Sequence, residues 1–427
     1  MTPKDKSILR DLAKKQMECA SSPENKKRED EWYKHNDLKG SRPLVTVDEW
    51  TFGHELARPL SCETEMGRDF ESRLMDEIIA REDIDDDRST PDFFPVKEKS
   101  WFTPFGMESK RIKVDDGIAY EYEHKVLDLE TDRFKLKGSK WGMRFSDKDP
   151  NDKSPNGKSP NDRGPNDIDS DEEFQIACDV FGDIMPVKLV SAYPEYSMSQ
   201  ILIRYMSMEN MLFALMDYPE WIHETFDRLT CDLFSYYKEK EQAGVLITNC
   251  LNQKLAQGTY SHTNDLNYKK GAAMSDMWGY FDSQETVGIS PKMFEEFFFP
   301  YYKRIMDMCG LVNYGCCEPV DKIWDNCLSK CKNIRKLSIS PWCDEEFIAD
   351  KLRGSSTIYH RKPSPNLVGA VGDFDEGQYR EHILATLKAA KGCKLEFSLR
   401  DIYSLNGDKT RARRAVQIIR DLIDQNW

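Results

Sequence analysis

The chain of 427 residues has no apolar run that approaches the ~20 residues needed to cross a membrane. Residues 1–30 are polar and lack the apolar core of a secretion signal, so we expect a cytoplasmic protein. The chain also has no excess of basic residues, because its formal net charge is −14. Nucleic acid is therefore excluded as an expected partner, since binding to phosphates needs a basic surface. This charge still allows an anionic small-molecule substrate in a locally basic pocket.

Two further patterns are missing from the sequence. The 12 cysteines do not follow the regular spacing of a disulfide framework. We therefore expect reduced thiols, most of them acting as small buried hydrophobic side chains. No Gly-x-Gly-x-x-Gly motif follows a predicted strand, so the signature of a dinucleotide-binding fold is absent.

Composition divides the first part of the chain into three segments. Residues 1–42 alternate basic and acidic side chains and predict a solvated terminal helix followed by a polar loop. Residues 43–146 predict an α+β subdomain packed on the rest, with a helix over Glu65–Arg81 and a hairpin over Ile118–Leu136. Residues 147–167 repeat Pro-Asn-Asp or Pro-Asn-Gly four times, which predicts a solvated, disordered loop.

In residues 172–427, short apolar runs alternate with longer helical patterns. The predicted strands are Ile184–Val190, Val245–Thr248, Leu311–Tyr314, Lys336–Ile339, Thr357–Tyr359 and Lys394–Ser398. The predicted helices are Met208–Met216, Pro219–Ala243, Pro291–Cys309, Val320–Leu328, Glu345–Leu352, Glu376–Ala390 and Lys409–Gln425. This alternation indicates a parallel α/β sheet, and about 250 residues are enough for a closed (β/α)8 TIM barrel with the preceding segments as an N-terminal α+β extension. An open doubly wound sheet is the alternative.

The segment from Gly310 to Val320 concentrates the most chemistry. Its apolar strand ends in Cys316, Cys317 and Glu318, and the carboxyl ends of strands carry the active sites of α/β barrels. Thiolates and carboxylates act as metal ligands or nucleophiles. Since neighbouring residues on a strand point to opposite faces, we expect one of the two thiols to face the barrel mouth. Two packing cysteines and a capping glutamate are the alternative.

Four stretches resemble the uroporphyrinogen decarboxylase superfamily, which includes zinc-dependent methyltransferases acting on corrinoid proteins and thiols. They are Asp217–Ile222 with Ala243-Gly244, Ile289–Tyr301, Leu311–Pro319 and Lys391–Asp401. The resemblance covers Glu172 to the C-terminus and, more weakly, the segment from Pro43. It implies a TIM barrel and either methyl transfer or decarboxylation.

The methyltransferases of this superfamily carry a His-x-Cys motif where this chain has Tyr314-Gly315-Cys316. The resemblance therefore implies a modified zinc site with Cys316, Cys317 and Glu318 as ligands, joined by His360 or Asp401. Zinc needs about four ligands, one position being left open in a catalytic site. A corrinoid carried by a partner protein and a homodimer are the partners that the resemblance implies.

A polar and aromatic cluster spans residues 276–286. Asp282 and Glu285 are candidates for proton transfer in catalysis, while Trp278, Tyr280 and Gln284 are candidates for the wall of a substrate pocket. A packed loop with satisfied caps is the alternative.

Further candidates follow other predicted strands. His262 is a candidate proton donor in a polar loop, although an exposed surface histidine is favoured there. Asp401 is a candidate catalytic acid. Substrate-binding candidates at strand ends are Tyr314, His360, Arg361 and Arg400, because a group of basic side chains suits a carboxylate or phosphate.

Three functions stay open from the sequence. The first is an enzyme that transfers a methyl group to or from a corrinoid or thiol at a cysteine-based metal site. The second is a metal-independent decarboxylase for a carboxylated ring compound. The third is a binding protein without catalysis, since a fold does not determine function.

Overall fold

A computed structural model describes residues 1–113, 120–143, 166, 168–369 and 372–427. The expected loop over 147–167 lies outside the described residues except for Asn166 and thus stays a prediction.

The main sheet has seven strands, all of them parallel, in the order β1-β13-β12-β11-β10-β9-β8. The strands of this sheet are β1 (Leu44–Val47), β8 (Glu195–Tyr196), β9 (Trp278–Phe281), β10 (Leu311–Tyr314), β11 (Ile334–Ile339), β12 (Ile358–Arg361) and β13 (Leu395–Leu399). Most of these strands are buried on both faces, as expected for a parallel sheet with covered faces. The predicted parallel α/β sheet is therefore confirmed.

The closed eight-stranded barrel stays a prediction, because the strand pairing among the described residues leaves β1 and β8 as the two edges of the sheet. The predicted strand Val245–Thr248 is not formed, and Ile247 makes only an isolated antiparallel bridge with Lys270. Two other strands, β2 (Phe94–Lys97) and β7 (Val187–Val190), pair only with each other.

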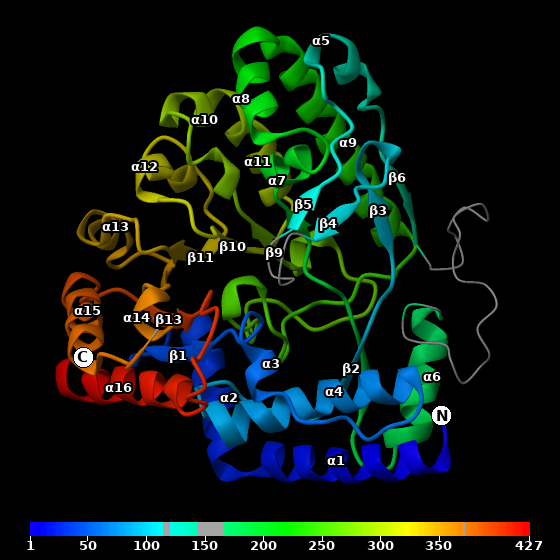
Figure 1. The fold of residues 1–427 in the computed structure, drawn as a ribbon, viewed down its shortest axis with the longest axis vertical. Coiled ribbons are helices and arrows are strands. Elements are labelled where there is room, and N and C mark those ends of the chain that lie inside the picture. The colour runs from blue at the N-terminus through cyan, green and yellow to red at the C-terminus, as the bar shows by residue number, and fades with distance from the viewer. Residues whose placement is uncertain (114–119, 144–165, 167, 370–371) are drawn as a thin grey trace.

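Helices surround the sheet (Figure 1). Those of the C-terminal part are α6 (Ser170–Phe181), α7 (Met198–Ile203), α8 (Met208–Asp217), α9 (Pro219–Gln242), α10 (Pro291–Phe297), α11 (Phe299–Met306), α12 (Asp321–Trp324), α13 (Glu345–Leu352), α14 (Asn366–Gly369), α15 (Glu376–Ala389) and α16 (Arg411–Asn426). Helix α10 begins with a residue pair that is typical of helix starts: the Ser290 hydroxyl caps it, and Pro291 occupies its first turn.

The N-terminal segment differs from the solvated helix that its charge pattern predicts. It forms α1 (Pro3–Ser21) and α2 (Pro23–Asn36), separated at Ser22, whose hydroxyl caps α2. Leu9 of α1 and Phe70 of α4 (Glu65–Ile79) are fully buried in a second apolar core, shared with α6, β2 and β7. Figure 1 shows α1, α2 and α4 stacked along one side of the molecule, near the C-terminal helix α16.

The rest of residues 43–146 is divided among several structures. The first strand, β1, belongs to the main sheet through its pairing with β13. The predicted hairpin is displaced: β5 (Tyr120–Tyr122) pairs with the earlier β4 (Arg111–Lys113), and α5 (Leu129–Asp132) follows. A third small sheet joins β3 (Trp101–Thr103) to β6 (Lys140–Gly142), and the short helix α3 (Gly53–Leu56) follows β1.

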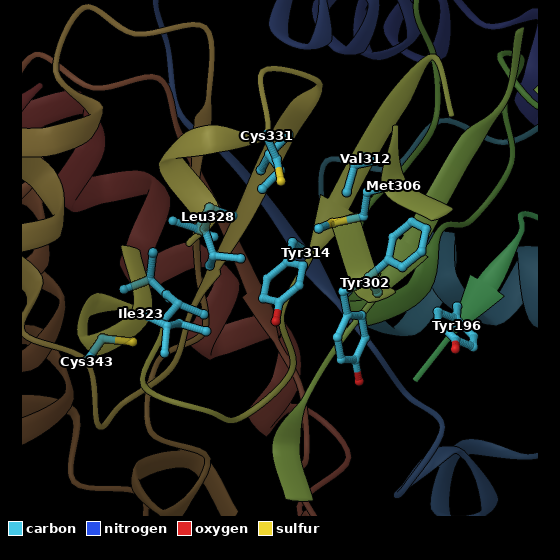
Figure 2. Packing of buried hydrophobic residues seen from close by; sticks show 14 of the residues in the cluster. Tyr196, Tyr302, Met306, Val312, Tyr314, Ile323, Leu328, Cys331 and Cys343 are labelled. Carbon is cyan, nitrogen blue, oxygen red and sulfur yellow. The ribbon is translucent and has the colours of Figure 1, made fainter. Parts of the chain in front are cut away.

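A packed aromatic layer lies beside the carboxyl ends of β9 and β10. Figure 2 shows Tyr302 and Tyr314 side by side, with both hydroxyl groups directed away from Val312 and Met306. Their ring centroids are 6.5 Å apart in an edge-on arrangement. Tyr302 Oη donates to the Asp282 carbonyl at 2.6 Å, and Tyr314 Oη lies 2.9 Å from Ser283 Oγ. This layer fixes residues 282–283 where β9 ends.

Candidate active site at the strand ends

The parallel sheet brings polar residues from distant segments to one edge. Asp48 follows β1, Asp282 follows β9, Cys316 follows β10, Lys362 follows β12, and Asp401 follows β13. Because parallel strands end at the same edge of a sheet, these positions converge where α/β enzymes carry their active sites.

The two thiols lie together rather than on opposite faces. Cys316 Sγ and Cys317 Sγ are 3.7 Å apart. The expectation that only one thiol faces the site is wrong, because β10 ends at Tyr314 and the strand geometry does not extend to the cysteines. Gly315 turns the chain there with a φ of 104°, a conformation that favours glycine.

The two thiols lie within hydrogen-bonding distance of each other, and either sulfur can donate. With Cys316 as the donor, this contact and the nearby Lys362 ammonium lower the pKa of Cys317 below its ordinary value of 9.0, whereas burial and the Asp401 carboxylate oppose the change. The same hydrogen bond, followed by burial, raises the pKa of Cys316. A thiolate is the nucleophilic form of cysteine, so the arrangement favours Cys317 as the nucleophile.

Lys362 is the cation of this site. Its side chain is only 3% exposed, and its ammonium donates to Gln257 Oε1 at 2.7 Å and to the Cys316 carbonyl. Within the described part of the chain, its contacts include no carboxylate. A buried charge needs a counter-ion, and the Cys317 thiolate is the group that can provide one.

Asp282 lies beside the thiols with one oxygen bonded. Tyr280 Oη donates to Asp282 Oδ2 at 2.6 Å, and Gln257 Nε2 donates to the same tyrosine hydroxyl at 2.6 Å. Asp282 is 7% exposed, and its Oδ1 accepts no hydrogen bond in the described structure. This free buried acceptor is available to a substrate proton.

Two further carboxyl groups surround Asp282. Burial and the Asp282 charge raise the pKa values of both Glu195 and Glu285 above the ordinary 4.5. Ser199 Oγ donates to Glu285 Oε2 at 2.8 Å. The cluster of like charges favours at least one protonated carboxyl group, as an acid–base site requires.

Glu318 does not join Cys316 and Cys317 in a metal site. Its Oε1 accepts the Ser283 amide at 2.9 Å, and its Oε2 accepts the Cys316 amide at 2.9 Å. Burial, together with the Asp282 charge, raises the pKa of Glu318 to about 7. Both oxygens are therefore used in fixing the loop. Among the described residues, no three His, Cys, Asp or Glu side chains are arranged to hold a metal ion. The zinc ligand set expected from the resemblance thus does not fit.

Arg400 and Asp401 close the site on the side of β13. Arg400 Nε lies 3.2 Å from Asp401 Oδ1 and 3.7 Å from Asp48 Oδ2. Cys317 Sγ is 3.9 Å from Asp401 Oδ2. The predicted catalytic Asp401 thus lies next to Cys317, beside the predicted substrate-binding Arg400. Glu285 instead bonds Ser199 and lies near the Asp282 charge.

Other candidates lie elsewhere. His262 is fully buried rather than exposed, because its ring stacks on Trp32 of α2 and its Nε2 lies 3.1 Å from Ser89 Oγ. Trp278 is buried at the beginning of β9, where its indole donates to the Ser261 carbonyl at 2.9 Å. Gln284 is exposed on a short helix.

The two residues at the end of β12 point to opposite faces of the sheet. Arg361 pairs with Glu345 of α13 at 2.5 Å and is buried between sheet and helices. His360 lies on the other face, with Nε2 2.8 Å from Ser398 Oγ. Neither contacts the thiols; Lys362, the third basic residue of this segment, donates to the carbonyl oxygen of Cys316.

A second polar network is enclosed within the sheet. Lys336 Nζ lies 3.0 Å from Glu396 Oε2, and both side chains are almost completely buried. His35 of α2 contacts the same carboxylate at 3.1 Å, and His360 contacts it at 3.6 Å. Burial would raise the pKa of Glu396, but Lys336 and His360 lower it below 4.5. Burial lowers the pKa of Lys336 to about 8.

The sequence prediction did not include several residues of the site. Lys362 belongs to a basic segment that was noticed, but Gln257, Asp48 and Glu195 lie in segments without a motif. Gln257 is placed by an inward loop, in which Ala256 accepts from Asn313 Nδ2 at 2.9 Å. Asp48 directly follows β1, so recognising that short strand was the signal that would have found it.

Comparisons with known proteins do not assign a family. No family model matches the chain, and no curated protein matches it. Among solved structures, a methyltransferase from Methanosarcina mazei matches 60% of this chain with a TM-score of 0.33 and 11% sequence identity. The matched region spans 63% of that methyltransferase. So weak a similarity does not establish a shared fold or activity, and the resemblance to the uroporphyrinogen decarboxylase superfamily stays a prediction.

None of the helices in the described part of the chain has the length and apolar character that a membrane span requires.

Proposed function

We propose that the protein is an enzyme that transfers a methyl group through the sulfur of Cys317. The observation that supports this most is the buried Lys362 ammonium, which donates to the Cys316 carbonyl, lowers the pKa of Cys317 and contacts no described carboxylate. Cys317 would act as a thiolate at neutral pH, because Cys316 and Lys362 both stabilise its negative charge.

The bonds formed and broken in this transfer balance, and the protein itself needs no bound metal ion. The Cys317 sulfur provides the electron pair of the new sulfur–carbon bond, and the leaving atom of the donor keeps the pair of the broken bond. A second displacement on the methylated sulfur then gives the methyl group to the acceptor. The second displacement returns Cys317 to its thiolate form, and an acceptor that loses a proton on methylation would pass it to the Asp282 carboxylate, whose Oδ1 accepts no hydrogen bond in the described structure.

The proposed methyl donor is a corrinoid, carried by a partner protein in the cell. Methylcobalamin is the free probe for this donor. After incubation with it, peptide mass spectrometry should find one added methyl group on Cys317 in the wild type and none at that position in Cys317→Ser. The matched control is Cys231→Ser, since Cys231 is exposed and lies outside the site. Absence of methyl from wild-type Cys317 would contradict the proposal.

A metal-independent decarboxylase is the second candidate. The Oδ1 of Asp282, which accepts no hydrogen bond in the described structure, is the observation that favours it, since cations such as Lys362 and Arg400 can hold a carboxylate while an acid protonates the resulting carbanion. In that case, release of carbon dioxide from an aromatic carboxylate would survive in Cys317→Ser and be lost in Asp282→Asn. Loss in both variants would exclude this second candidate.

A further inference from the structure

A cavity of about 300 Å³ lies beside β8, the strand that neighbours β9 in the main sheet. Four segments enclose it: residues 98–104, the turn 192–197 around β8, α7 and α9. Its volume is at the lower end of those that hold small molecules. This size matches a single ring that carries one polar group.

The wall of the cavity is largely aromatic. Phe102, Tyr193, Tyr236 and Tyr237 line it, together with the aliphatic side chains of Ile201, Leu233 and Leu246. The Phe102 and Tyr236 rings lie 5.4 Å apart at a tilt of 48°. Such a wall favours a flat apolar body, because aromatic rings pack well edge-on or offset against one another.

The two cationic side chains that line the cavity, Lys240 and Arg204, differ in whether they pair with a carboxylate. Lys240 pairs with Glu98 at 2.7 Å and is thus neutralised. Arg204, in contrast, donates from Nη2 to the uncharged Gln200 Oε1 at 2.5 Å, and its Nε is buried without a partner. Arg204 forms no ion pair with a carboxylate of the described residues. Its guanidinium is therefore the cation available to an anionic group in the cavity.

Two hydrogen-bonding groups stand near this cation. Ser197 is among the residues that line the cavity and is 4% exposed, and its Oγ is buried without a hydrogen-bond partner in the described structure. Glu195 also lines the cavity, and desolvation of its carboxyl group together with the Asp282 charge raises its pKa. Unsatisfied buried polar groups in a cavity are typical of a site completed by a ligand.

One layer of side chains separates the cavity from the proposed active site. Tyr193 borders the cavity, and its ring lies 6.2 Å from that of Tyr280, whose hydroxyl group bonds Asp282. Glu195 also lies in the register opposite Tyr280 on the neighbouring strand. A molecule in the cavity would therefore lie within one side chain of the Asp282 cluster.

We propose that this cavity binds an aromatic carboxylic acid, whose carboxylate pairs with Arg204 and bonds Ser197 and whose ring lies among Phe102, Tyr193 and Tyr236. The identification of this molecule as the substrate rests on the proposed function. The binding site itself is defined by the cavity and its unsatisfied groups, and does not require the thiol chemistry.

Isothermal titration calorimetry with benzoate tests the binding. Benzoate should bind saturably to the wild type, and the uncharged isostere benzamide should bind at least about tenfold more weakly, because a charged hydrogen bond is lost. Arg204→Gln should weaken benzoate binding by about tenfold or more, and Arg204→Lys should restore part of it. The matched control is Arg304→Gln, since Arg304 pairs with Asp227 outside the cavity.

Two results would overturn the proposal: no saturable benzoate binding in the millimolar range, or equal binding of benzoate and benzamide by the wild type. The latter comparison does not depend on any variant folding. Cys317→Ser should bind benzoate like the wild type. Retained benzoate binding with no methyl transfer would reject the proposed function alone, whereas methyl transfer with no benzoate binding would reject the cavity proposal alone.

Discussion

At the scale of residues, the site combines a cysteine and a lysine whose charges would compensate each other. The Cys317 thiolate needs a cation, and the buried Lys362 needs an anion. The hydrogen bond between the two thiols, with Cys316 as the donor, raises the pKa of Cys316 and lowers that of Cys317. The chemistry thus depends on the two cysteines and the lysine together rather than on any one of them.

Removing the cation should change reactivity more than stability. Lys362→Met should raise the midpoint of the pH profile for iodoacetamide alkylation of Cys317 by about one pH unit, because an opposite charge is lost. The free energy of unfolding should change little, since the lysine contacts no described carboxylate that would be left unpaired. Lys330→Met, which removes a surface lysine paired with Glu295, is the control. An unchanged Cys317 profile in Lys362→Met would show that the ammonium does not stabilise the thiolate.

Removing the neighbouring thiol provides an independent check. Cys316→Ala takes away the donor that contributes most to the lowered pKa of Cys317. The alkylation midpoint of Cys317 should therefore move upward, toward the value of about 8.5 for a free thiol. Peptide mass mapping across pH 6 to 10 measures this shift. A downward shift would contradict the hydrogen-bonded arrangement.

At the scale of elements, sequence patterns predicted much of the C-terminal part. The run Leu311–Tyr314 matches β10 at both ends, and α13 begins and ends where the helical spacing predicts. The short strands β1 and β9 are not among those that the sequence predicts: β1 has four residues, and β9 contains Gly279 within the polar and aromatic cluster of residues 276–286. Both are strands because of their neighbours in the sheet, which a local pattern does not reveal.

The interior polar network was equally hidden from sequence reasoning. Lys336 and Glu396 lie within strands that were recognised by their apolar residues, and only the pairing of β11, β12 and β13 places these charges close together. His262 was assigned to the surface because polar loops are usually exposed. Its burial results from α2, whose Trp32 covers the loop.

The pair Lys336–Glu396 should be essential for stability. Glu396→Leu leaves a buried ammonium without its carboxylate, and should lower the free energy of unfolding by about 3 kcal/mol in urea denaturation. The double variant Lys336→Met with Glu396→Leu should lose clearly less, because no charge is left unpaired. The exposed pair Lys303–Asp307 is the control, and Asp307→Asn should cost less than about 1 kcal/mol. A double variant as unstable as the sum of the two single variants would refute this coupling.

At the scale of the whole molecule, the N-terminal helices complete the fold. The second apolar core contains α1, and His35 of α2 reaches Glu396 inside the sheet. A truncation that removes residues 1–36 should therefore expose both cores and fail to fold. Circular dichroism and size-exclusion chromatography would show loss of the cooperative thermal transition and aggregation. A truncated protein that is monomeric and unfolds cooperatively would mean that α1 and α2 are dispensable.

Buried histidines should make the whole molecule acid-sensitive. Burial lowers the pKa values of His262 and His360 to about 3, from 6.5. The unfolded chain takes up protons first as the pH falls below about 6.5, so stability is full above that pH and decreases toward pH 3. His262→Gln should lower the slope of unfolding free energy between pH 6 and 5 by about 1 kcal/mol per pH unit. An unchanged slope would indicate that His262 is protonated in the folded protein.

The reactivity of Cys317 across pH tests the account most directly. Wild-type protein is alkylated with iodoacetamide from pH 6 to 10, and peptide mass spectrometry measures the rates at Cys317 and at the exposed Cys231 in the same sample. We predict that Cys317 reacts with a midpoint below that of Cys231, as its lowered pKa requires. A Cys317 that stays unreactive, or that reacts only at or above the midpoint of Cys231, would contradict a thiolate at the centre of this site.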